Sequence, residues 1–168
     1  MNVPRGIVKI DGIALADLPR IGLFATDTTA LGARAGVGDE PAARETGDGV
    51  LIIHGHSDLT EMDESFARTY GTRVVAVGLS SSADICTLSV SDEHGRRRHL
   101  VDALEESSLN TGDPLPEEEG FERLTEQSAL AIFGRLTGIT RDAIADSEFV
   151  ILRSAQEQDV VTPATRPS

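Results

Sequence analysis

Aromatic residues and cysteine are scarce in this chain of 168 residues. It has no Trp, one Tyr and five Phe, so Val, Ile, Leu and Ala must supply most of the core. Cys86 is the only cysteine, which excludes an intramolecular disulfide and a cysteine-based zinc site. The apolar runs are too short to span a bilayer, and residues 1–9 lack the apolar segment of a secretory signal. We therefore expect a cytoplasmic protein.

Positive charge is also scarce. The chain has 15 Lys and Arg residues against 28 Asp and Glu residues, which gives a formal net charge of −13, and Lys9 is its single lysine. Such a field repels nucleic-acid phosphates and anionic membranes, so we expect neither as a partner and favour a basic protein. High net charge also keeps proteins soluble, and it does not assign a function by itself.

The apolar pattern predicts an α+β fold in one domain. Strands are expected over residues 6–15, 21–26, 50–53, 73–80, 85–91, 96–104 and 149–152, and helices over 58–70 and 126–136. Short connections between the middle three strands make them antiparallel neighbours. We therefore expect a mainly antiparallel sheet of about five to seven strands with two principal helices packed on it. The domain is expected over 1–153, with a disordered tail over 154–168.

One strand of the middle group alternates between apolar and polar residues. Cys86, Leu88 and Val90 are expected to face inward, with the intervening Thr and Ser residues facing outward. This position predicts that Cys86 is a small buried hydrophobe and not a reactive thiolate.

Two histidines lie between the strand over 50–53 and the next helix, in His54-Gly55-His56-Ser57-Asp58. These five residues resemble the H-x-H-x-D-H signature of metallo-β-lactamase-fold hydrolases. The resemblance implies a metal site on His54, His56 and Asp58, with zinc as the metal, and a metal-dependent hydrolase. Leu59 stands where that signature has its last histidine.

The same segment has a simpler interpretation. Asp58 is expected to cap the following helix, with Glu61 three residues later completing a capping box. Gly55 then permits the turn, and the two histidines bind backbone groups or solvent. The sequence does not decide between the two interpretations.

A basic run, Arg96-Arg97-Arg98-His99, interrupts the acidic sequence. On a regular strand, Arg96 and Arg98 point to one face and Arg97 and His99 to the other. Arg96 and Arg98 are candidates for an anion-binding site. The alternative is that they pair with this protein's own carboxylates, such as those of Glu117 and Glu118.

The segment over 105–120 is acidic and contains two prolines, which predicts a loop. It is our candidate contact surface for a basic partner. Its candidate contact residues are Glu105, Glu106, Asp113, Glu117, Glu118 and Glu119.

A longer resemblance covers roughly residues 70–152. It rests on Gly71-Thr72-Arg73-Val74-Val75, the hairpin residues Gly95 to Arg98, the stretch from Gly112 to Glu118, and Leu136-Thr137-Gly138-Ile139-Thr140. These segments resemble a widespread group of small uncharacterised bacterial proteins that carry a domain of unknown function. The resemblance implies a compact α+β domain and implies no activity.

Three functions remain open. The first is a non-catalytic interaction or regulatory protein, for example of the immunity type, that binds a basic partner. The second is a small metal-dependent hydrolase that uses His54, His56 and Asp58. The third is a small-molecule enzyme or binder of a biosynthetic pathway, with a pocket between the sheet and the helices. The sequence does not decide whether the protein is an enzyme.

Overall fold

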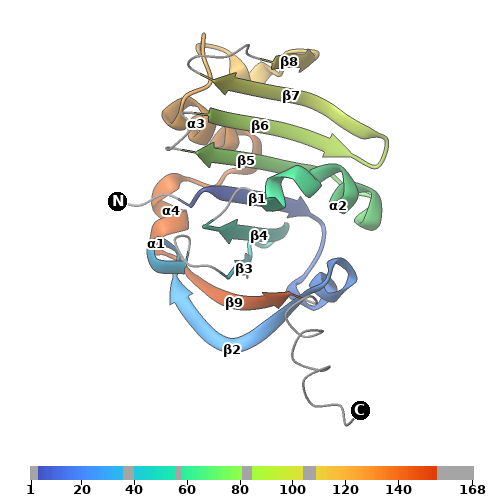
Figure 1. Cartoon of the computed structure of the whole chain (residues 1–168), viewed down its shortest axis with the longest axis vertical. Coiled ribbons are helices and arrows are strands. Elements are labelled where there is room, and N and C mark those ends of the chain that lie inside the picture. Colours follow the sequence, from blue (N-terminus) through green and yellow to red (C-terminus); the bar gives the residue numbers. More distant parts are fainter. Residues whose placement is uncertain (1–3, 36–39, 56–57, 81–84, 104–108, 155–168) are drawn as a thin grey trace, which may run out of the picture.

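The computed structural model describes residues 4–35, 40–55, 58–80, 85–103 and 109–154. These residues form one nine-stranded sheet with the order β2-β9-β3-β4-β1-β5-β6-β7-β8 (Figure 1). Each pair of neighbouring strands in it is antiparallel. The predicted α+β class and the antiparallel pairing are confirmed, but the sheet has nine strands and not five to seven.

The described elements follow one another along the chain with short connections. The strands are β1 (Gly6–Asp11), β2 (Leu23–Leu31), β3 (Ala42–Glu45), β4 (Gly49–His54), β5 (Val74–Ser80), β6 (Ile85–Asp92), β7 (Gly95–Ala103), β8 (Leu109–Gly112) and β9 (Glu148–Ser154). The α-helices are α1 (Gly32–Ala35), α2 (Asp63–Tyr70), α3 (Glu126–Thr137) and α4 (Arg141–Asp146). Three 3₁₀ helices are η1 (Leu15–Ile21), η2 (Asp58–Met62) and η3 (Pro116–Glu118).

The strands missing from the prediction are short. β3 and β8 have four residues each; β3 lies where no strand was expected, and β8 lies in the segment over 105–120 that was predicted to be a loop. They form because β4 and β9 pair with β3, and β7 pairs with β8, which supplies backbone partners whatever the local propensity. The strand expected over 6–15 ends early, at Asp11, and its last predicted residue begins η1.

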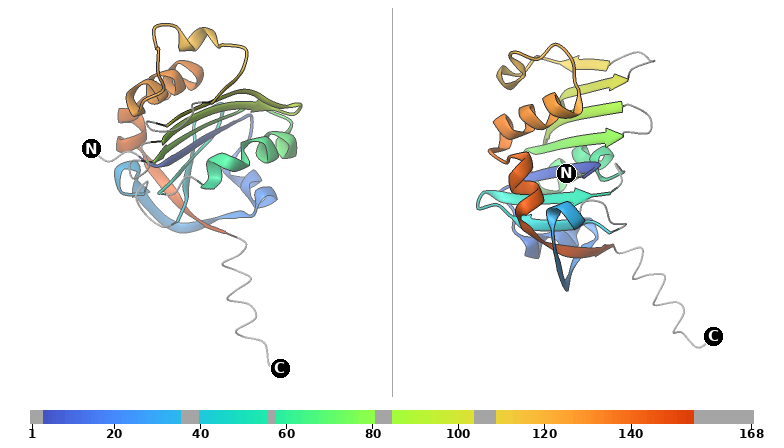
Figure 2. Two further views of the ribbon diagram at one scale, coloured as in Figure 1. Left: turned by 45° about the horizontal axis from the view of Figure 1, so that its top comes forward. Right: turned by 90° about the vertical axis from the view of Figure 1, so that its left-hand side faces the viewer.

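The core has two layers, one on each face of the sheet. One face packs against α1, α3 and α4, with Phe133 and Phe149 among its buried residues. The other face packs against η1 and α2, with Leu18 and Phe66 among its buried residues. Figure 2 shows α2 and α3 on opposite sides of the sheet. Successive residues of the central strands therefore alternate between two buried layers.

The predicted antiparallel group β5–β6–β7 is confirmed, with one correction. Cys86, Leu88 and Val90 face the α3 layer as expected, but Cys86 is half-buried and not fully buried. Ser89 and Ser91 were expected to face outward, but both are buried on the α2 side of the sheet. They are buried because the first residue of α2 bonds to Ser91 and lies over this end of the strand.

The helix predicted from Asp58 begins later. Residues Asp58–Met62 form η2, and α2 starts at Asp63 after Met62, whose side chain makes no capping hydrogen bond. Phe66 is buried, whereas Met62 is exposed. The side chain of Asp58 is not described, so its predicted capping bond stays a prediction. The end at Gly71, in the left-handed conformation with φ of 62°, is as expected.

Lys9 is fully buried in β1. Its Nζ lies 2.8 Å from Asp11 Oδ1 and 3.0 Å from Asp48 Oδ1. Arg73 binds the other oxygen of Asp11 at 2.8 Å and also donates to the carbonyl of Leu136 at the end of α3. This group of charges therefore joins β1 to the residues just before β4 and β5 and to the end of α3.

Ser154, the first residue of the predicted tail, is instead the last residue of β9. The rest of the predicted tail, residues 155–168, lies outside the described residues.

Candidate functional site

The segment between β8 and α3 arches over the β8 edge of the sheet (Figures 1 and 2). Its carboxylates are Asp113, Glu117, Glu118, Glu119 and Glu122, and its one cation is Arg123. We call these five acidic residues the acidic end. Four of them are predicted contact residues. The other two predicted contact residues, Glu105 and Glu106, lie outside the described residues.

Glu118 has a structural role within the acidic end. Arg98, which is 2% exposed, donates from Nε to Glu118 Oε2 at 2.7 Å and from Nη2 to Glu118 Oε1 at 2.6 Å. Its Nη1 also donates to Asn110 and to the carbonyl of Gly112. The hydrogen bond from Arg98 is the main reason that the pKa of Glu118 is lowered. Glu118 therefore anchors η3 to β7 and β8 and is not available to a partner.

Two further arginines hold the segment in place. Arg123 makes two hydrogen bonds to Asp102 of β7, at 2.7 and 3.2 Å, and they lower the pKa of Asp102. Arg135 of α3 donates to the backbone carbonyls of Glu117 and Glu119 at 3.0 and 2.8 Å. Its guanidinium also lies over the ring of Phe121. The acidic end is thus bound to both the sheet and α3.

Four carboxylates of the acidic end are left without a cation. In the part of the chain that the structure describes, Asp113, Glu117, Glu119 and Glu122 make no ion pair. Asp113, Glu119 and Glu122 are exposed, and Glu117 is half-buried. Negative charge is therefore concentrated here and is not neutralised by described side chains.

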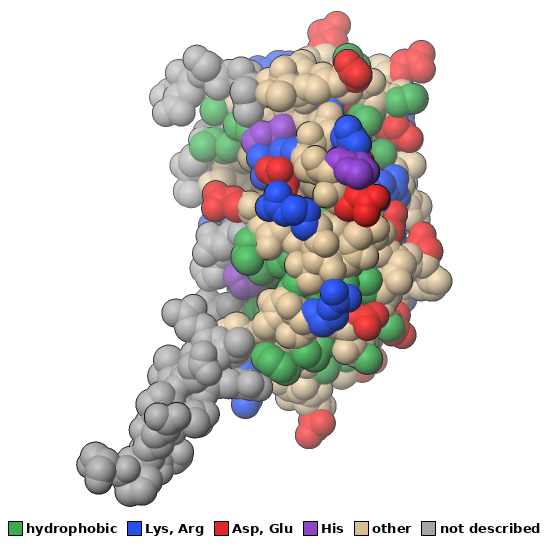
Figure 3. All heavy atoms as spheres, turned by 90° about the vertical axis from the view of Figure 1, so that its right-hand side faces the viewer, with side chains coloured by type: hydrophobic (Ala, Val, Ile, Leu, Met, Phe, Trp, Pro, Cys, Tyr) green, Lys and Arg blue, Asp and Glu red, His purple; other side chains and the backbone are tan. Residues whose placement is uncertain are grey.

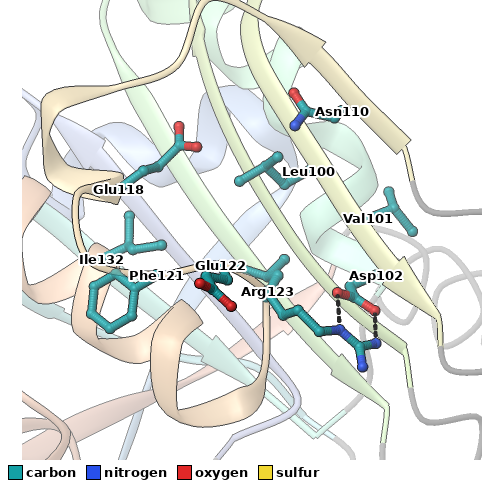
Figure 4. A pocket seen from close by; sticks show the side chains of 10 residues that line it. Leu100, Val101, Asp102, Asn110, Glu118, Phe121, Glu122, Arg123 and Ile132 are labelled. Carbon is teal, nitrogen blue, oxygen red and sulfur yellow. Dashed lines mark hydrogen bonds and ion pairs between the residues drawn. The ribbon is translucent and has the colours of Figure 1, made fainter.

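A hollow of about 290 Å³ lies beneath this segment (Figure 4). Leu100, Phe121 and Ile132 supply apolar surface, and Glu122 lines it with a carboxylate. Figure 4 shows Arg123 turned to Asp102 across one side of the hollow, where the two ion-pair bonds occupy both groups. The hollow therefore combines apolar walls with one unpaired carboxylate.

A second charged cluster lies on the other face of the sheet. The carboxylate of Asp63 is fully buried and accepts hydrogen bonds from Arg96 Nη2 at 2.7 Å, Arg96 Nε at 3.1 Å and Ser91 Oγ at 2.6 Å. Burial acts to raise the pKa of Asp63, but hydrogen bonds from Arg96, Ser91 and Ser89 outweigh it and lower the pKa. Asp63 is therefore ionised and holds Arg96 in a defined orientation.

His99 completes this cluster. Its Nδ1 lies 3.5 Å from Arg96 Nη1. A guanidinium only donates hydrogen bonds, so Nδ1 is assigned as the acceptor and Nε2 carries the proton. Burial and the charge of Arg96 lower the pKa of His99 below 6.5, against the opposite effect of Asp63 and Glu64. The ring is therefore neutral at pH 7.

The prediction that Arg96 and Arg98 lie on the same face of the sheet is wrong. Ser91 pairs with Arg96 and Val90 pairs with Arg98, so a β-bulge inserts Arg97 between them. The bulge places Arg96 and His99 on the α2 face and Arg98 on the α3 face. The two arginines therefore do not form one anion-binding site. The alternative, that the run pairs with this protein's own acids, is confirmed for Arg98 and Glu118.

Charges of both signs lie together around the β6–β7 hairpin. Arg97 pairs with Asp92 at 2.6 Å, and His94 lies 3.5 Å from Glu93. Figure 3 shows basic, acidic and histidine side chains close together in the upper part of this side of the molecule. This surface is mixed in charge, unlike the acidic end.

The predicted metal ligands are only partly described. His54 is the last residue of β4 and is half-buried, His56 lies outside the described residues, and the side chain of Asp58 is not described. Within the described ranges, no three His, Cys, Asp or Glu side chains are grouped as a metal site. The metal site on His54, His56 and Asp58 therefore stays a prediction.

Sequence reasoning did not identify Asp63 or Asp102 as binding partners of the arginines. Asp63 escaped notice because the helix was expected to begin at Asp58. The available signal was the pair of serines, Ser89 and Ser91, on the strand face that α2 covers.

Comparison with known proteins adds no assignment. No family model, no curated protein and no solved structure matches the chain. The resemblance over residues 70–152 stays a prediction. None of the helices in the described residues is long and apolar enough to cross a membrane.

Proposed function

We propose that this protein is a non-catalytic interaction or regulatory protein that binds a basic protein partner through the acidic end. The observation that carries the proposal is the set of four carboxylates without a cation in the described residues, Asp113, Glu117, Glu119 and Glu122. The two arginines beside them, Arg98 and Arg123, are used by Glu118 and Asp102.

The hollow of Figure 4 gives the contact a place for a partner's side chain. Lys and Arg each combine an apolar stem with a cationic head. The stem matches Leu100, Phe121 and Ile132, and the head matches Glu122, which has no described ion-pair partner. An arginine in a desolvated pocket near the centre of an interface is a common binding hot spot.

The rigidity of the segment also supports binding. Bonds to Arg98 and Arg135 hold η3 and the residues after it against the sheet and α3. A surface held in its binding conformation loses less conformational entropy on association. The remaining charge of the chain adds long-range attraction for a basic partner, which weakens as salt rises.

The test uses fluorescein-labelled deca-arginine as the basic probe and measures its fluorescence anisotropy with the full chain. The variant Glu117→Gln/Glu119→Gln/Glu122→Gln spares Glu118, whose loss would disturb the fold. The control Asp27→Asn/Glu40→Gln/Glu148→Gln removes three exposed negative charges elsewhere. We expect the acidic-end variant to weaken binding at least about fivefold and the control less than about twofold.

Two results would overturn the proposal. Equal losses in the two variants would mean that the probe responds only to net charge. Binding that is unchanged in the acidic-end variant, or independent of salt, would remove these carboxylates from the contact. Thermal melts of both variants establish that the fold is retained.

A further inference from the structure

A second hollow, of about 530 Å³, lies on the face of β5, β6 and β7 that carries α2. Its volume is within the range of small-molecule sites. The hollow is bordered by η2, which contributes Thr60 and Glu61, and its floor includes Thr87, Ser89, Arg96 and His99. It is on the opposite face of the sheet from the Arg98–Glu118 pair and plays no part in the proposed contact with a protein.

Asp63 fixes the orientation of the Arg96 side chain and leaves some of its N–H donors unused. Two of its N–H groups donate to the buried carboxylate of Asp63, while Nη1 faces only the ring of His99, at 3.5 Å, among the described side chains. Because Arg96 is 27% exposed and lines the hollow, its remaining donors border open space. Asp63 thus acts as a positioning residue for a guanidinium that can bind a planar acceptor group.

Two other polar groups of the lining are also donors. His99 is neutral with its proton on Nε2, and Thr87 carries a hydroxyl group, whereas the hydroxyl of Ser89 already donates to Asp63. Donors of this kind around an oriented guanidinium fit a carboxylate of the ligand. Ser89 is 5% exposed, so the groups at this point are largely removed from bulk water.

Glu61 determines which charge the ligand must carry besides its carboxylate. It is exposed on η2, lines the hollow and makes no ion pair with a described residue. A simple anion would meet Glu61, Glu64 and the negative field of the whole chain, with only Arg96 to offset them. A ligand with a cationic group beside its carboxylate can pair with Glu61 as well as with Arg96, which both line the hollow.

We propose that this hollow binds a free amino acid as a zwitterion, with the carboxylate at Arg96 and His99 and the ammonium group at Glu61. The site recognises the two charged groups through these three side chains. The side chain of the amino acid is accommodated by Ile85 and Val101, two of the apolar residues of the lining.

The test measures the melting temperature of the full chain with each standard amino acid at about 5 mM, followed by calorimetric titration of those that raise it. We expect at least one amino acid to stabilise the protein. Its carboxamide and its N-acetyl derivative are expected to bind at least about tenfold more weakly, since each loses one charged contact.

The matched variants are Glu61→Gln and His99→Gln, with Glu148→Gln on β9 as the control. Arg96 is left in place because its loss would strand the buried Asp63 carboxylate. We expect the two site variants to weaken binding at least about tenfold and the control to have no effect. The proposal is overturned if no amino acid stabilises the chain, if the two derivatives bind as well as the parent, or if Glu61→Gln binds normally.

Discussion

The two faces of β7 each carry an arginine that makes a two-pronged bond to a carboxylate, yet the two pairs differ in burial. On the α3 face, Arg98 is almost completely buried and its partner Glu118 is 15% exposed. On the α2 face, the order is reversed, because Asp63 is fully buried and Arg96 is 27% exposed. The member that reaches solvent is therefore the acid in one pair and the base in the other.

This difference decides what each pair can do. Arg98 has its donors bound by Glu118, Asn110 and the carbonyl of Gly112, so the pair joins β7, β8 and η3 and offers nothing to a ligand. Arg96 has donors left at the border of a hollow. The same ion-pair chemistry thus serves as a structural cross-link on one face and as a positioning device on the other.

The β-bulge at Arg97 creates this division. Without the extra residue, Arg96 and Arg98 would share a face two positions apart. With it, one arginine enters each layer of the molecule, and His99 joins Arg96. One inserted residue therefore supplies cations to two separate layers from a single basic run.

Removal of one arginine from each pair tests the comparison most strongly. Arg96→Met leaves the carboxylate of Asp63 buried without a counterion, which we expect to cost about 3–5 kcal/mol of unfolding free energy. Arg98→Met leaves Glu118 near the surface, where it can turn into water, and we expect a cost of about 1–3 kcal/mol. Urea unfolding at pH 7 measures both.

The double variant Asp63→Leu/Arg96→Met is the control for the larger effect. It removes the buried charge together with its partner, so we expect it to recover much of the stability that Arg96→Met loses. A cost for Arg98→Met as large as that for Arg96→Met would contradict the reversed burial of the two pairs.

The sequence predicts those parts of the fold in which the residues of an element themselves carry a clear apolar pattern. The alternation of β6 and the apolar residues of β5 predicted the central strands correctly, and they also predicted the face of β6 that carries Leu88 and Val90. The opposite face of β6 was expected to be exposed, but Ser89 and Ser91 on it are buried. β3 and β8 were missed because neighbouring strands, and not their own residues, make them strands. The bounds of η1 and α2 were missed because turns of 3₁₀ helix have no clear pattern in sequence.

The site was predictable only in part, for a related reason. Local charge was enough to single out Arg96, Arg98 and the acidic segment. The bulge has no signature in the basic run, so the expected alternation placed Arg96 and Arg98 on the same face, whereas the structure places them on opposite faces. Asp63 becomes a partner of Arg96 only through packing of α2 on the sheet, which a local pattern does not encode.

A substitution at Gly112 tests how closely β8 approaches the backbone of β7 at Arg97. Gly112 has φ of +94°, and a Cβ there would lie 2.1 Å from the carbonyl oxygen of Arg97. We expect Gly112→Ala to cost about 1–3 kcal/mol and to increase hydrogen exchange of the β8 amides. Hydrogen exchange with mass spectrometry, together with urea unfolding, measures both effects.

Gly47→Ala is the matched control for this contact. Gly47 has a similar φ of +91°, but a Cβ there would meet nothing within 4 Å. It therefore carries the cost of the backbone conformation alone, about 1 kcal/mol. Equal costs at the two positions would show that β8 does not approach Arg97 as closely as described.

The smallest expected effect is the pH dependence of the stability that His99 contributes on the α2 side of the sheet. The folded state lowers the pKa of His99 from 6.5, mainly through burial and then through the charge of Arg96. Between the folded and unfolded pKa values the unfolded state binds more protons, so stability falls as pH drops through this window below 6.5.

The carboxylates change the stability at lower pH. Asp63 and Glu118 have folded pKa values below 3.8 and 4.5, so their stabilisation is present above those values and is lost as pH falls further.

His99→Gln separates these two ranges. The variant removes the group that titrates first, so its unfolding free energy is expected to change less than that of the parent between about pH 6.5 and 5. Below about pH 4 the two proteins are expected to lose stability in parallel, because Asp63, Asp102 and Glu118 remain. Urea unfolding at a series of pH values gives both slopes. His94→Gln, which replaces an exposed histidine of the β6–β7 hairpin, is the control for the loss of a histidine. If His99→Gln and the parent have the same slope above pH 5, His99 is not held neutral beside Arg96, and the donor assigned to Nε2 on the floor of the second hollow is lost.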